Sequence, residues 1–346
     1  MNNKLIIAGP CSAETEEQVF KTAEALAKTG NINMLRAGIW KPRTRPGSFE
    51  GVGTIGLKWL IDAGKAVNLP VITEVANRDH VLLALQAGFK NLWIGARTTA
   101  NPFATQEIAD SLKGQEIDTL FIKNPINPDL QLWIGAIERF QKTGVKNIGV
   151  IHRGFSAFKT NKYRNEPLWE IPLNLKLQFP NIKLICDPSH ICGQRDILEE
   201  VSQKAMDLEY DGLMIETHPE PDKAWSDAKQ QITPERVNIL LESLIMRQKY
   251  SKNPESEVLL ASYRNEMKVM DNEILEILGE RMRIAEKIGA LKKENSITIL
   301  QQERWKEVKE ERIEVGLKND LTEKFLNRYL NALHQESIRH QTKVMN

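Results

Sequence analysis

The chain has 346 residues, of which 41% are hydrophobic and 27% charged, and its formal net charge is +1. This length is enough for two domains, and the small net charge argues against nucleic acid or a membrane surface as a partner of the whole molecule. No hydrophobic run is long enough to span a bilayer, the first residues lack a signal-peptide pattern, and three widely spaced cysteines suit a reducing compartment. We therefore expect a cytoplasmic protein.

Composition divides the chain near residue 247. Fourteen of the 15 prolines and 17 of the 20 glycines precede Arg247, and the rest is dense in charges of both signs. Few turn-forming residues among mixed charges indicate long helices. We predict a first domain over residues 1–246, a polar linker over 247–256 and a helical domain over 257–346.

Eight short hydrophobic runs recur in the first domain, separated by helical patterns. Continuous hydrophobic strands that alternate with helices predict a parallel sheet covered on both faces. Eight such units favour an α/β fold of the (β/α)8 TIM barrel type, with an open, doubly wound sheet as the alternative. The predicted strands cover residues 4–9, 34–38, 71–75, 91–96, 119–123, 147–151, 183–186 and 212–215.

A barrel brings together the residues that follow the carboxyl ends of its strands, where such barrels hold their active sites. Every predicted strand ends at a polar or ionisable group, so we expect a functional site there rather than scattered surface polarity. The groups are Cys11, Arg36, Glu74, Arg97, Lys123, His152 with Arg153, Asp187 with His190, and Glu216 with His218.

Cations dominate this expected site. Four come from strand ends and one from the Pro-bracketed loop after residue 40; they are Arg36, Lys41, Arg97, Lys123 and Arg153. By itself the loop is equally consistent with a solvated basic surface. Converging cations repel one another unless an anion binds between them, so we expect a small substrate that carries both phosphate and carboxylate.

A second group of residues suits a metal ion. Cys11, His190, Glu216 and Asp227 offer sulfur, nitrogen and oxygen ligands, a mixture that fits Mn²⁺, Fe²⁺, Co²⁺ or Zn²⁺. Cys11 as a small buried residue and Asp227 as a charge at a helix start are the structural alternatives. Cys192, two residues after His190, is an alternative candidate for a metal ligand.

The glycines Gly51, Gly53 and Gly56 match a dinucleotide-binding fingerprint. That motif requires a strand immediately before it, and a loop precedes it here. We therefore interpret these glycines as a loop before a helix.

Eight segments of the first domain form a recognisable series: Gly9-Pro10-Cys11-Ser12, Arg36-Ala37-Gly38, Lys41-Pro42-Arg43-Thr44, Gly95-Ala96-Arg97-Thr98-Thr99, Ile122-Lys123-Asn124, His152-Arg153-Gly154, Asp187-Pro188-Ser189-His190 and Glu216-Thr217-His218-Pro219. In this order, they strongly resemble the synthases that condense phosphoenolpyruvate with a sugar aldehyde phosphate. The tetrad Lys41-Pro42-Arg43-Thr44 resembles the branch that uses erythrose 4-phosphate, the 3-deoxy-D-arabino-heptulosonate 7-phosphate (DAHP) synthases of type Iβ. The alternative is the KDO8P synthase branch, which uses arabinose 5-phosphate and carries a different loop there.

This resemblance implies residue roles. The five cations named above would bind phosphoenolpyruvate, with Lys41 and Lys123 as catalytic residues and Lys123 or a water on the metal in proton transfer. Arg43 and Thr44 would bind erythrose 4-phosphate. The four candidate ligands would hold a divalent metal, Mn²⁺ first among the candidates, that polarises the aldehyde as a Lewis acid.

The last hundred residues predict two long helices with polar interruptions. Residues 254–293 carry a hydrophobic stripe and would span about 60 Å, which exceeds the core of so small a domain, so a second chain is expected to pair with it. Arg281 and Lys292 interrupt that stripe, and Ser337 and Gln341 interrupt the hydrophobic face of a helix over 321–344. Polar groups on otherwise buried faces predict a ligand pocket between helices. The stripe consists of Leu260, Tyr263, Met267, Met270, Ile274, Leu278, Ala285 and Ile288.

This region resembles the all-helical chorismate mutases of the AroQ class. The resemblance implies an intertwined homodimer in which Arg264 enters the partner's site. Arg264 and Arg281 would bind the two carboxylates of chorismate, and Lys292 and Gln341 would donate to its ether oxygen. The matching positions, all expected in or near the site, are Arg264, Asp271, Arg281, Lys292, Arg304, Ser337 and Gln341.

The chain departs from the mutase pattern at Gln301 and Trp305, where many members carry acidic groups near the substrate hydroxyl. Together, the two resemblances imply a bifunctional enzyme of aromatic amino-acid biosynthesis. We hypothesise that the mutase domain binds its product prephenate and inhibits the barrel. The alternative is a non-catalytic helical tail that serves dimerisation or effector binding.

Overall fold

The computed structural model describes residues 4–41, 47, 49–157 and 162–346. The chain separates into two compact units, with the division between Arg247 and Gln248. Each unit has its own packing and is described by itself. None of the described helices combines the length and hydrophobicity that a membrane crossing requires.

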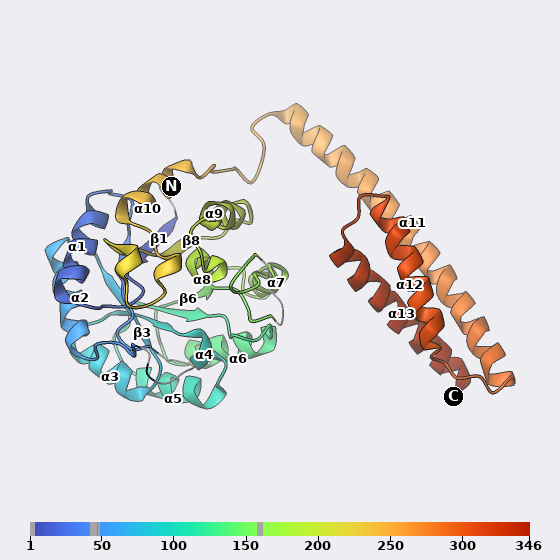
Figure 1. Ribbon diagram of the computed structural model, residues 1–346, viewed down its shortest axis with the longest axis horizontal. Coiled ribbons are helices and arrows are strands. Elements are labelled where there is room, and N and C mark those ends of the chain that lie inside the picture. Colours follow the sequence, from blue (N-terminus) through green and yellow to red (C-terminus); the bar gives the residue numbers. More distant parts are fainter. Residues whose placement is uncertain (1–3, 42–46, 48, 158–161) are drawn as a thin grey trace. The chain divides into compact units, whose positions relative to one another are not determined.

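The first unit is a closed barrel of eight parallel strands, each paired with the next and β8 paired with β1 (Figure 1). Closure excludes the open doubly wound sheet. The strands are β1 (Leu5–Gly9), β2 (Met34–Arg36), β3 (Val71–Val75), β4 (Asn91–Ile94), β5 (Thr119–Lys123), β6 (Asn147–His152), β7 (Lys183–Cys186) and β8 (Gly212–Glu216).

Helices surround this barrel on its outside (Figure 1). They are α1 (Glu16–Ala27), α2 (Ile55–Ala66), α3 (Arg78–Gln86), α4 (Ala96–Thr99), α5 (Pro102–Leu112), α6 (Leu130–Gln141), α7 (Glu170–Gln178), α8 (Pro188–Cys192), α9 (Leu198–Asp207) and α10 (Pro234–Ser243), with short 3₁₀ turns η1 (Pro221–Lys223) and η2 (Ala228–Gln230) after β8. Gly51 and Gly53 lie in an irregular segment before α2, as the sequence predicts, but the prediction is wrong at Gly56, which lies in the first turn of α2.

One side chain from each strand fills the barrel interior. A larger hydrophobic layer lies between the sheet and the helices, so both faces of every strand are buried. This explains why the strands read as continuous hydrophobic runs. The interior residues are Ile7, Met34, Ile72, Trp93, Phe121, Ile151, Ile185 and Met214.

Two predicted strands are too long. β2 ends at Arg36 because Gly38 exchanges backbone hydrogen bonds with the loop after β1, accepting from Ala13 and donating to Cys11. β4 ends at Ile94 because Gly95 caps the short helix α4. Both differences lie at the barrel mouth, where the chain leaves the sheet to build the site.

The second unit consists of three helices, α11 (Pro254–Glu294), α12 (Gln302–Leu317) and α13 (Glu323–Met345), and α13 packs against both others (Figure 1). Asn253 caps α11 by accepting from the Glu255 N–H, and Pro254 occupies the first turn. Residues 254–256 of the predicted linker are therefore helical.

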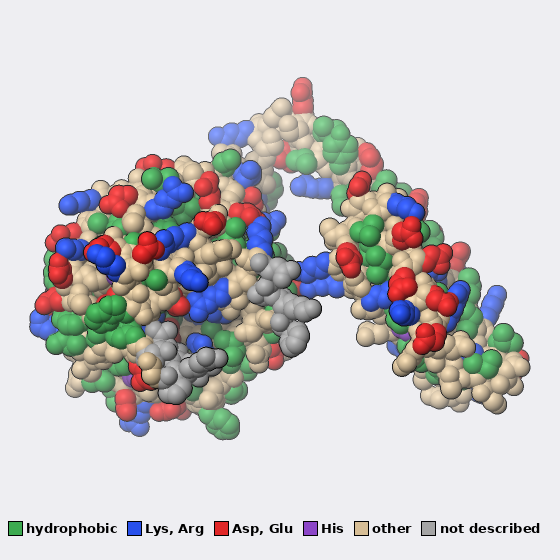
Figure 2. Space-filling view, in the orientation of Figure 1, with side chains coloured by type: hydrophobic (Ala, Val, Ile, Leu, Met, Phe, Trp, Pro, Cys, Tyr) green, Lys and Arg blue, Asp and Glu red, His purple; other side chains and the backbone are tan. Residues whose placement is uncertain are grey.

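The predicted hydrophobic stripe of α11 is largely exposed in the single chain. Met267 and Met270 are 64% and 59% exposed, and Figure 2 shows hydrophobic side chains on the surface of this unit. Ile288 is exposed like most of the stripe, and the residues of α11 that are buried within the single chain are Met282, Ala285 and Gly289. Gly289 lets α13 approach, since a Cβ there would lie 2.9 Å from the Gln341 Cα.

Candidate active sites

The barrel mouth brings the predicted metal ligands together. Cys11 follows β1, Glu216 ends the neighbouring strand β8, and Asp227 precedes η2. One sulfur or oxygen atom from each of these three lies within 4.8 Å of the others. His190, on α8, places its Nε2 3.6 Å from the Glu216 Oε1. The four residues predicted from the sequence therefore share one place, with His190 at the edge of the tighter group.

The chemistry of this cluster fits a divalent cation. Burial raises the pKa of the Cys11 thiol to about 12, and the Glu216 carboxylate contributes to that rise. The Glu216 Oε1 is buried and accepts no hydrogen bond from the described residues, although it is paired with Arg36 at 3.1 Å. A cation would replace the thiol proton and would balance two crowded carboxylates. Cys192 donates to the Ile197 carbonyl instead and is outside this cluster.

Arg164, which the sequence argument missed, holds two of the ligands. Its NH1 donates to the Asp227 Oδ1 at 3.0 Å and to the Gln230 Oε1 at 2.7 Å. The Gln230 Nε2 in turn donates to the Glu216 Oε2 at 2.6 Å. Burial works to raise the pKa of Asp227, but the Arg164 cation holds it well below its usual range. Arg164 lies well beyond the end of β6 in the sequence, so the pattern of polar residues at strand ends does not predict it.

Asp187 links a predicted catalytic cation to a predicted ligand. Its Oδ2 lies 2.9 Å from the Lys123 Nζ and 2.7 Å from the His190 Nδ1. Asp187 also caps α8 by accepting from the His190 N–H. A carboxylate on one ring nitrogen orients the other toward a metal, so Asp187 fixes the direction of the His190 ring.

The deepest cation of the mouth, Arg36, has hydrogen-bonding capacity to spare. It is 1% exposed and lies over the ring of Trp93, 4.9 Å from its centroid. Its Nε and NH1 are buried and have no partner among the described residues. Lys123, 4% exposed, lies over the same ring. Because buried donors rarely remain unpaired, this arrangement indicates an anion site.

The remaining predicted cations surround this position at different depths. The Lys41 Nζ donates to the Cys11 Sγ at 3.0 Å, and the Arg153 NH1 donates to the Asn165 Oδ1 at 2.7 Å. Burial lowers the pKa of Arg153 to about 10, and the cations of Arg164 and Arg97 add to the shift. Arg43 and Thr44, predicted to bind the sugar phosphate, lie outside the described residues.

Two of the strand-end histidines do not belong to the site. The His152 ring contacts the Pro167 carbonyl and the Tyr210 hydroxyl, and burial lowers its pKa to about 3. Because Ile151 points into the barrel, its neighbour His152 must point outward. His218 is paired with Glu14 at 3.4 Å.

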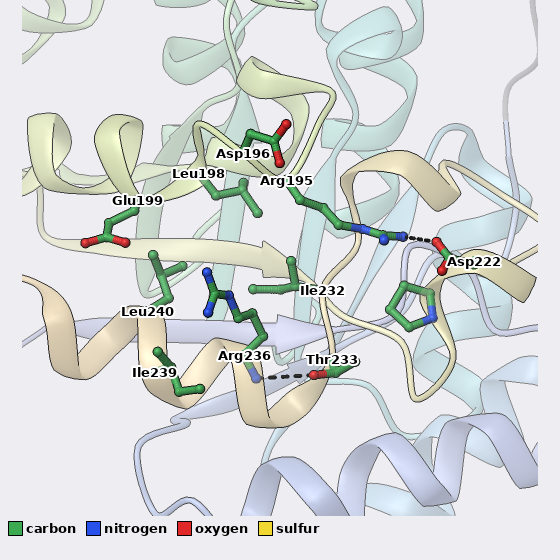
Figure 3. Close-up of a pocket in the computed structure, with 11 residues that line it drawn as sticks. Arg195, Asp196, Leu198, Glu199, Asp222, Ile232, Thr233, Arg236, Ile239 and Leu240 are labelled. Carbon is green, nitrogen blue, oxygen red and sulfur yellow. Dashed lines mark hydrogen bonds and ion pairs between the residues drawn. The ribbon is translucent and has the colours of Figure 1, made fainter.

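A cavity of about 410 Å³ adjoins the segment that carries Asp227 (Figure 3). Arg195, in its wall, pairs with Asp222 and donates to the carbonyls of Gln231 and Ala228. Among the described residues, no predicted site residue lines this cavity. The hydrogen bonds of Arg195 instead hold the backbone of the segment that carries Asp227.

In the helical unit, four of the seven predicted residues lie on the facing sides of α11 and α13, and Asp271 is exposed. The Arg281 NH1 donates to the Ser337 Oγ at 2.5 Å, and the Lys292 Nζ donates to the Ile299 carbonyl at 2.6 Å. The Gln341 Oε1 is buried and has no hydrogen-bond partner among the residues that the structure describes. Arg304 pairs with Glu307 on its own helix, and Arg264 is exposed. The single chain therefore does not bring these two arginines to the others.

A closed α/β barrel with cations and a metal-type cluster at its mouth defines an enzyme for small anionic substrates. The chain belongs to the DAHP synthetase I family, whose model matches residues 1–252, and residues 263–342 match the model of chorismate mutase type II. Both are enzyme families, so the chain is a DAHP synthase barrel fused to a mutase domain of the AroQ type.

The relatives from Thermotoga maritima agree with the assignment of the barrel. The chain is 31% identical to a phospho-2-dehydro-3-deoxyheptonate aldolase of Thermotoga maritima over 69% of this chain and 68% of that protein. A crystal structure of the DAHP synthase of T. maritima is 29% identical with a TM-score of 0.61, covering 69% of this chain and 67% of that one. A 2-dehydro-3-deoxyphosphooctonate aldolase of Desulfotalea psychrophila is 25% identical over 70% of this chain and 88% of that protein.

Proposed function

We propose that the barrel condenses phosphoenolpyruvate with erythrose 4-phosphate to give DAHP and inorganic phosphate. The observation that carries this proposal is the buried Arg36, with two unpaired nitrogens, directly beside the cluster of Cys11, Glu216 and Asp227. An anion site next to a metal-type cluster suits a reaction between an enol phosphate and an aldehyde.

Different residues of the barrel mouth would have different roles in this reaction. Arg36, Lys123, Arg97 and Arg153 would bind the phosphate and carboxylate of phosphoenolpyruvate, and Lys41 would meet the charge that develops beside Cys11. Carbon 3 of phosphoenolpyruvate bonds to the aldehyde carbon, water adds at carbon 2, and phosphate leaves with cleavage of its C–O bond. Lys123, whose Nζ donates to the Asp187 Oδ2, or a water on the metal would transfer a proton.

A divalent ion held by Cys11, His190, Glu216 and Asp227 would supply Lewis acidity for the aldehyde. DAHP synthases are generally metal-dependent, and the mixed donor set supports Mn²⁺, with Fe²⁺, Co²⁺ and Zn²⁺ as alternatives. The three cysteines are free thiols, which supports our proposal of a cytoplasmic, reducing location.

The test is phosphoenolpyruvate consumption by metal-stripped protein, offered erythrose 4-phosphate or arabinose 5-phosphate, each with and without Mn²⁺. We expect consumption with erythrose 4-phosphate and metal together. Consumption with arabinose 5-phosphate would move the barrel to the KDO8P branch, which the lower identity of the phosphooctonate aldolases does not favour. No consumption with either sugar would contradict the proposal.

We propose further that the helical domain rearranges chorismate to prephenate as an intertwined homodimer. The exposed stripe on α11 would pack against a second chain, and Arg264 would enter the partner's pocket beside Arg281. Arg264 and Arg281 would bind the carboxylates, with Arg304 and Ser337 nearby, while Lys292 and Gln341 would donate to the ether oxygen. Direct assay of chorismate consumption separates this proposal from a non-catalytic dimerisation or effector-binding tail.

Regulation follows as a separate proposal: prephenate bound in the helical domain inhibits the barrel. Its support is the fusion of the two activities in one chain. We expect added prephenate to lower the rate of DAHP formation, and a titration that leaves this rate unchanged would contradict the proposal.

A further inference from the structure

His334 shares one face of α13 with Ser337 and Gln341, because residues three and seven positions apart lie on the same side of a helix. The His334 Nε2 is buried and has no hydrogen-bond partner in the described part of the chain, and the same holds for the Gln341 Oε1. Folded proteins leave few buried polar atoms unpaired. Two of them on one helix face therefore mark a place where a bound molecule supplies the partners.

Trp305 fixes the orientation of the His334 ring. The two rings stack with centroids 3.8 Å apart and planes 8° apart. A stacked imidazole can present only its edge to a ligand. Trp305 stands where the mutase pattern expects an acidic group near the substrate hydroxyl, but an indole N–H cannot accept a hydrogen bond. In this chain, the residue at that position instead supports a histidine from the opposite helix.

The charges around His334 favour a neutral ring. Burial lowers its pKa, and the cations of Arg281 and Lys292 on α11 lower it further. A neutral imidazole has one nitrogen that donates and one that accepts, so it can pair with a hydroxyl. Because the neutral His334 ring carries no charge, it would not compete with the neighbouring cations for the carboxylates of a ligand.

Chorismate offers two carboxylates, an ether oxygen and a ring hydroxyl. The proposed roles of Arg264, Arg281, Lys292 and Gln341 account for all of these groups except the hydroxyl. We propose that His334, held in place by Trp305, recognises this hydroxyl and so determines specificity for chorismate. The inference rests on the proposed mutase function, and it moves hydroxyl recognition from α12 to α13.

The test compares two variants of the full-length chain, each with two ligands, as in a double-mutant cycle. Wild type and His334→Ala are each measured with chorismate and with the analogue whose ring hydroxyl is replaced by hydrogen, as kcat/KM and as Kd by calorimetry. We expect His334→Ala to lose about tenfold of the preference for chorismate, the effect of one hydrogen bond, with little change for the analogue. His334→Gln, which keeps an amide near the Nε2 position, should recover part of this preference.

His340→Ala is the matched control, because His340 lies on the same helix and is paired with Glu286 at 2.8 Å. It should leave the preference unchanged. An equal loss for both ligands in His334→Ala would show a structural role and overturn the proposal. If wild type binds both ligands without turnover, the mutase function fails, and the Kd cycle alone decides the role of His334. Wild type that binds neither ligand would overturn both.

Discussion

The barrel mouth and the helical unit both contain cations that we propose bind anionic substrates, but they differ in how those cations are held. At the mouth, Lys123 is held by Asp187, and Asp227 is held by Arg164, all within one chain. In the helical unit, Arg281 contacts Ser337, whereas Arg264 is exposed. A closed parallel sheet brings distant strand ends together by itself. A 41-residue helix leaves much of its hydrophobic stripe exposed in the single chain, so the proposed site in this unit would need a second chain.

The largest effect should come from Cys11→Ala, which removes a central ligand of the barrel. We expect Mn²⁺ affinity to fall more than a hundredfold, beyond the effect of losing a supporting contact, and DAHP formation to drop to background. Metal binding is measured by electron paramagnetic resonance of free Mn²⁺, and activity by phosphoenolpyruvate consumption. Cys192→Ala, which removes a buried thiol outside the cluster, is the control. Full activity of Cys11→Ala would refute the ligand assignment.

Lys292→Ala tests the other region. Loss of one donor to a developing oxyanion typically costs a hundredfold to a thousandfold in rate, and we expect mutase turnover to fall by about this much. The oligomeric state, measured by light scattering, should not change. Lys287→Ala, an exposed residue of the same helix, should behave as wild type. Unchanged turnover in Lys292→Ala would rule out the pocket.

The contrast between the regions also explains what the sequence could and could not predict. Eight hydrophobic runs predicted the strands because both faces of each strand are buried, and strand ends such as Cys11 and Glu216 predicted the cluster. His152 was placed wrongly because its strand turns successive side chains to opposite faces. Arg164 and Gln230 were missed because loops bring them to the site from positions that no periodicity marks.

For the helices, periodicity predicted length well and packing less well. The predicted end of α11 differs by one residue from the observed Glu294. The buried row through Met282 and Gly289 follows instead from the close approach of α13, which a stripe of large hydrophobic residues does not reveal. The residues around Met270 are exposed in the single chain, and their burial would require the proposed dimer.

Met270→Glu would break the proposed dimer and so sharpen the contrast. Met270 is 59% exposed in the single chain, and a carboxylate there would be buried in the expected interface. We expect dimer affinity to fall about a hundredfold (roughly 3 kcal/mol), with mutase activity lost in parallel. Asn272→Glu, on the opposite side of the helix, is the control. A dimer of undiminished affinity, measured by analytical ultracentrifugation, would exclude this face.

Arg164→Ala should have a smaller effect than loss of a ligand. Arg164 touches the metal site only through Asp227 and Gln230, and supporting contacts of this kind typically contribute tenfold to a hundredfold in metal affinity. We expect the Mn²⁺ Kd to rise within this range while the fold is retained. Lys162→Ala, which breaks an exposed pair with Glu200, is the control. An unchanged Kd would show that Asp227 and Glu216 are positioned without Arg164.

The smallest effect concerns stability of the barrel against acid. Burial lowers the pKa of His152 to about 3 in the folded chain, whereas an unfolded histidine titrates near pH 6.5. The unfolded chain therefore binds a proton that the folded chain does not, and the contribution of His152 is fully present above pH 6.5. It is lost as the pH falls toward 3, at a slope of at most about 1.4 kcal/mol per pH unit.

His152→Gln keeps a polar group near the Pro167 carbonyl but cannot titrate. We expect the variant to be less stable at pH 7, because the Tyr210 contact is weakened, and to lose stability less steeply between pH 6.5 and 4.5. Urea unfolding of the barrel, followed by tryptophan fluorescence at several pH values, measures this slope. Parallel pH curves for wild type and His152→Gln would show that acid acts on other groups, and the buried ring would then have only a packing role.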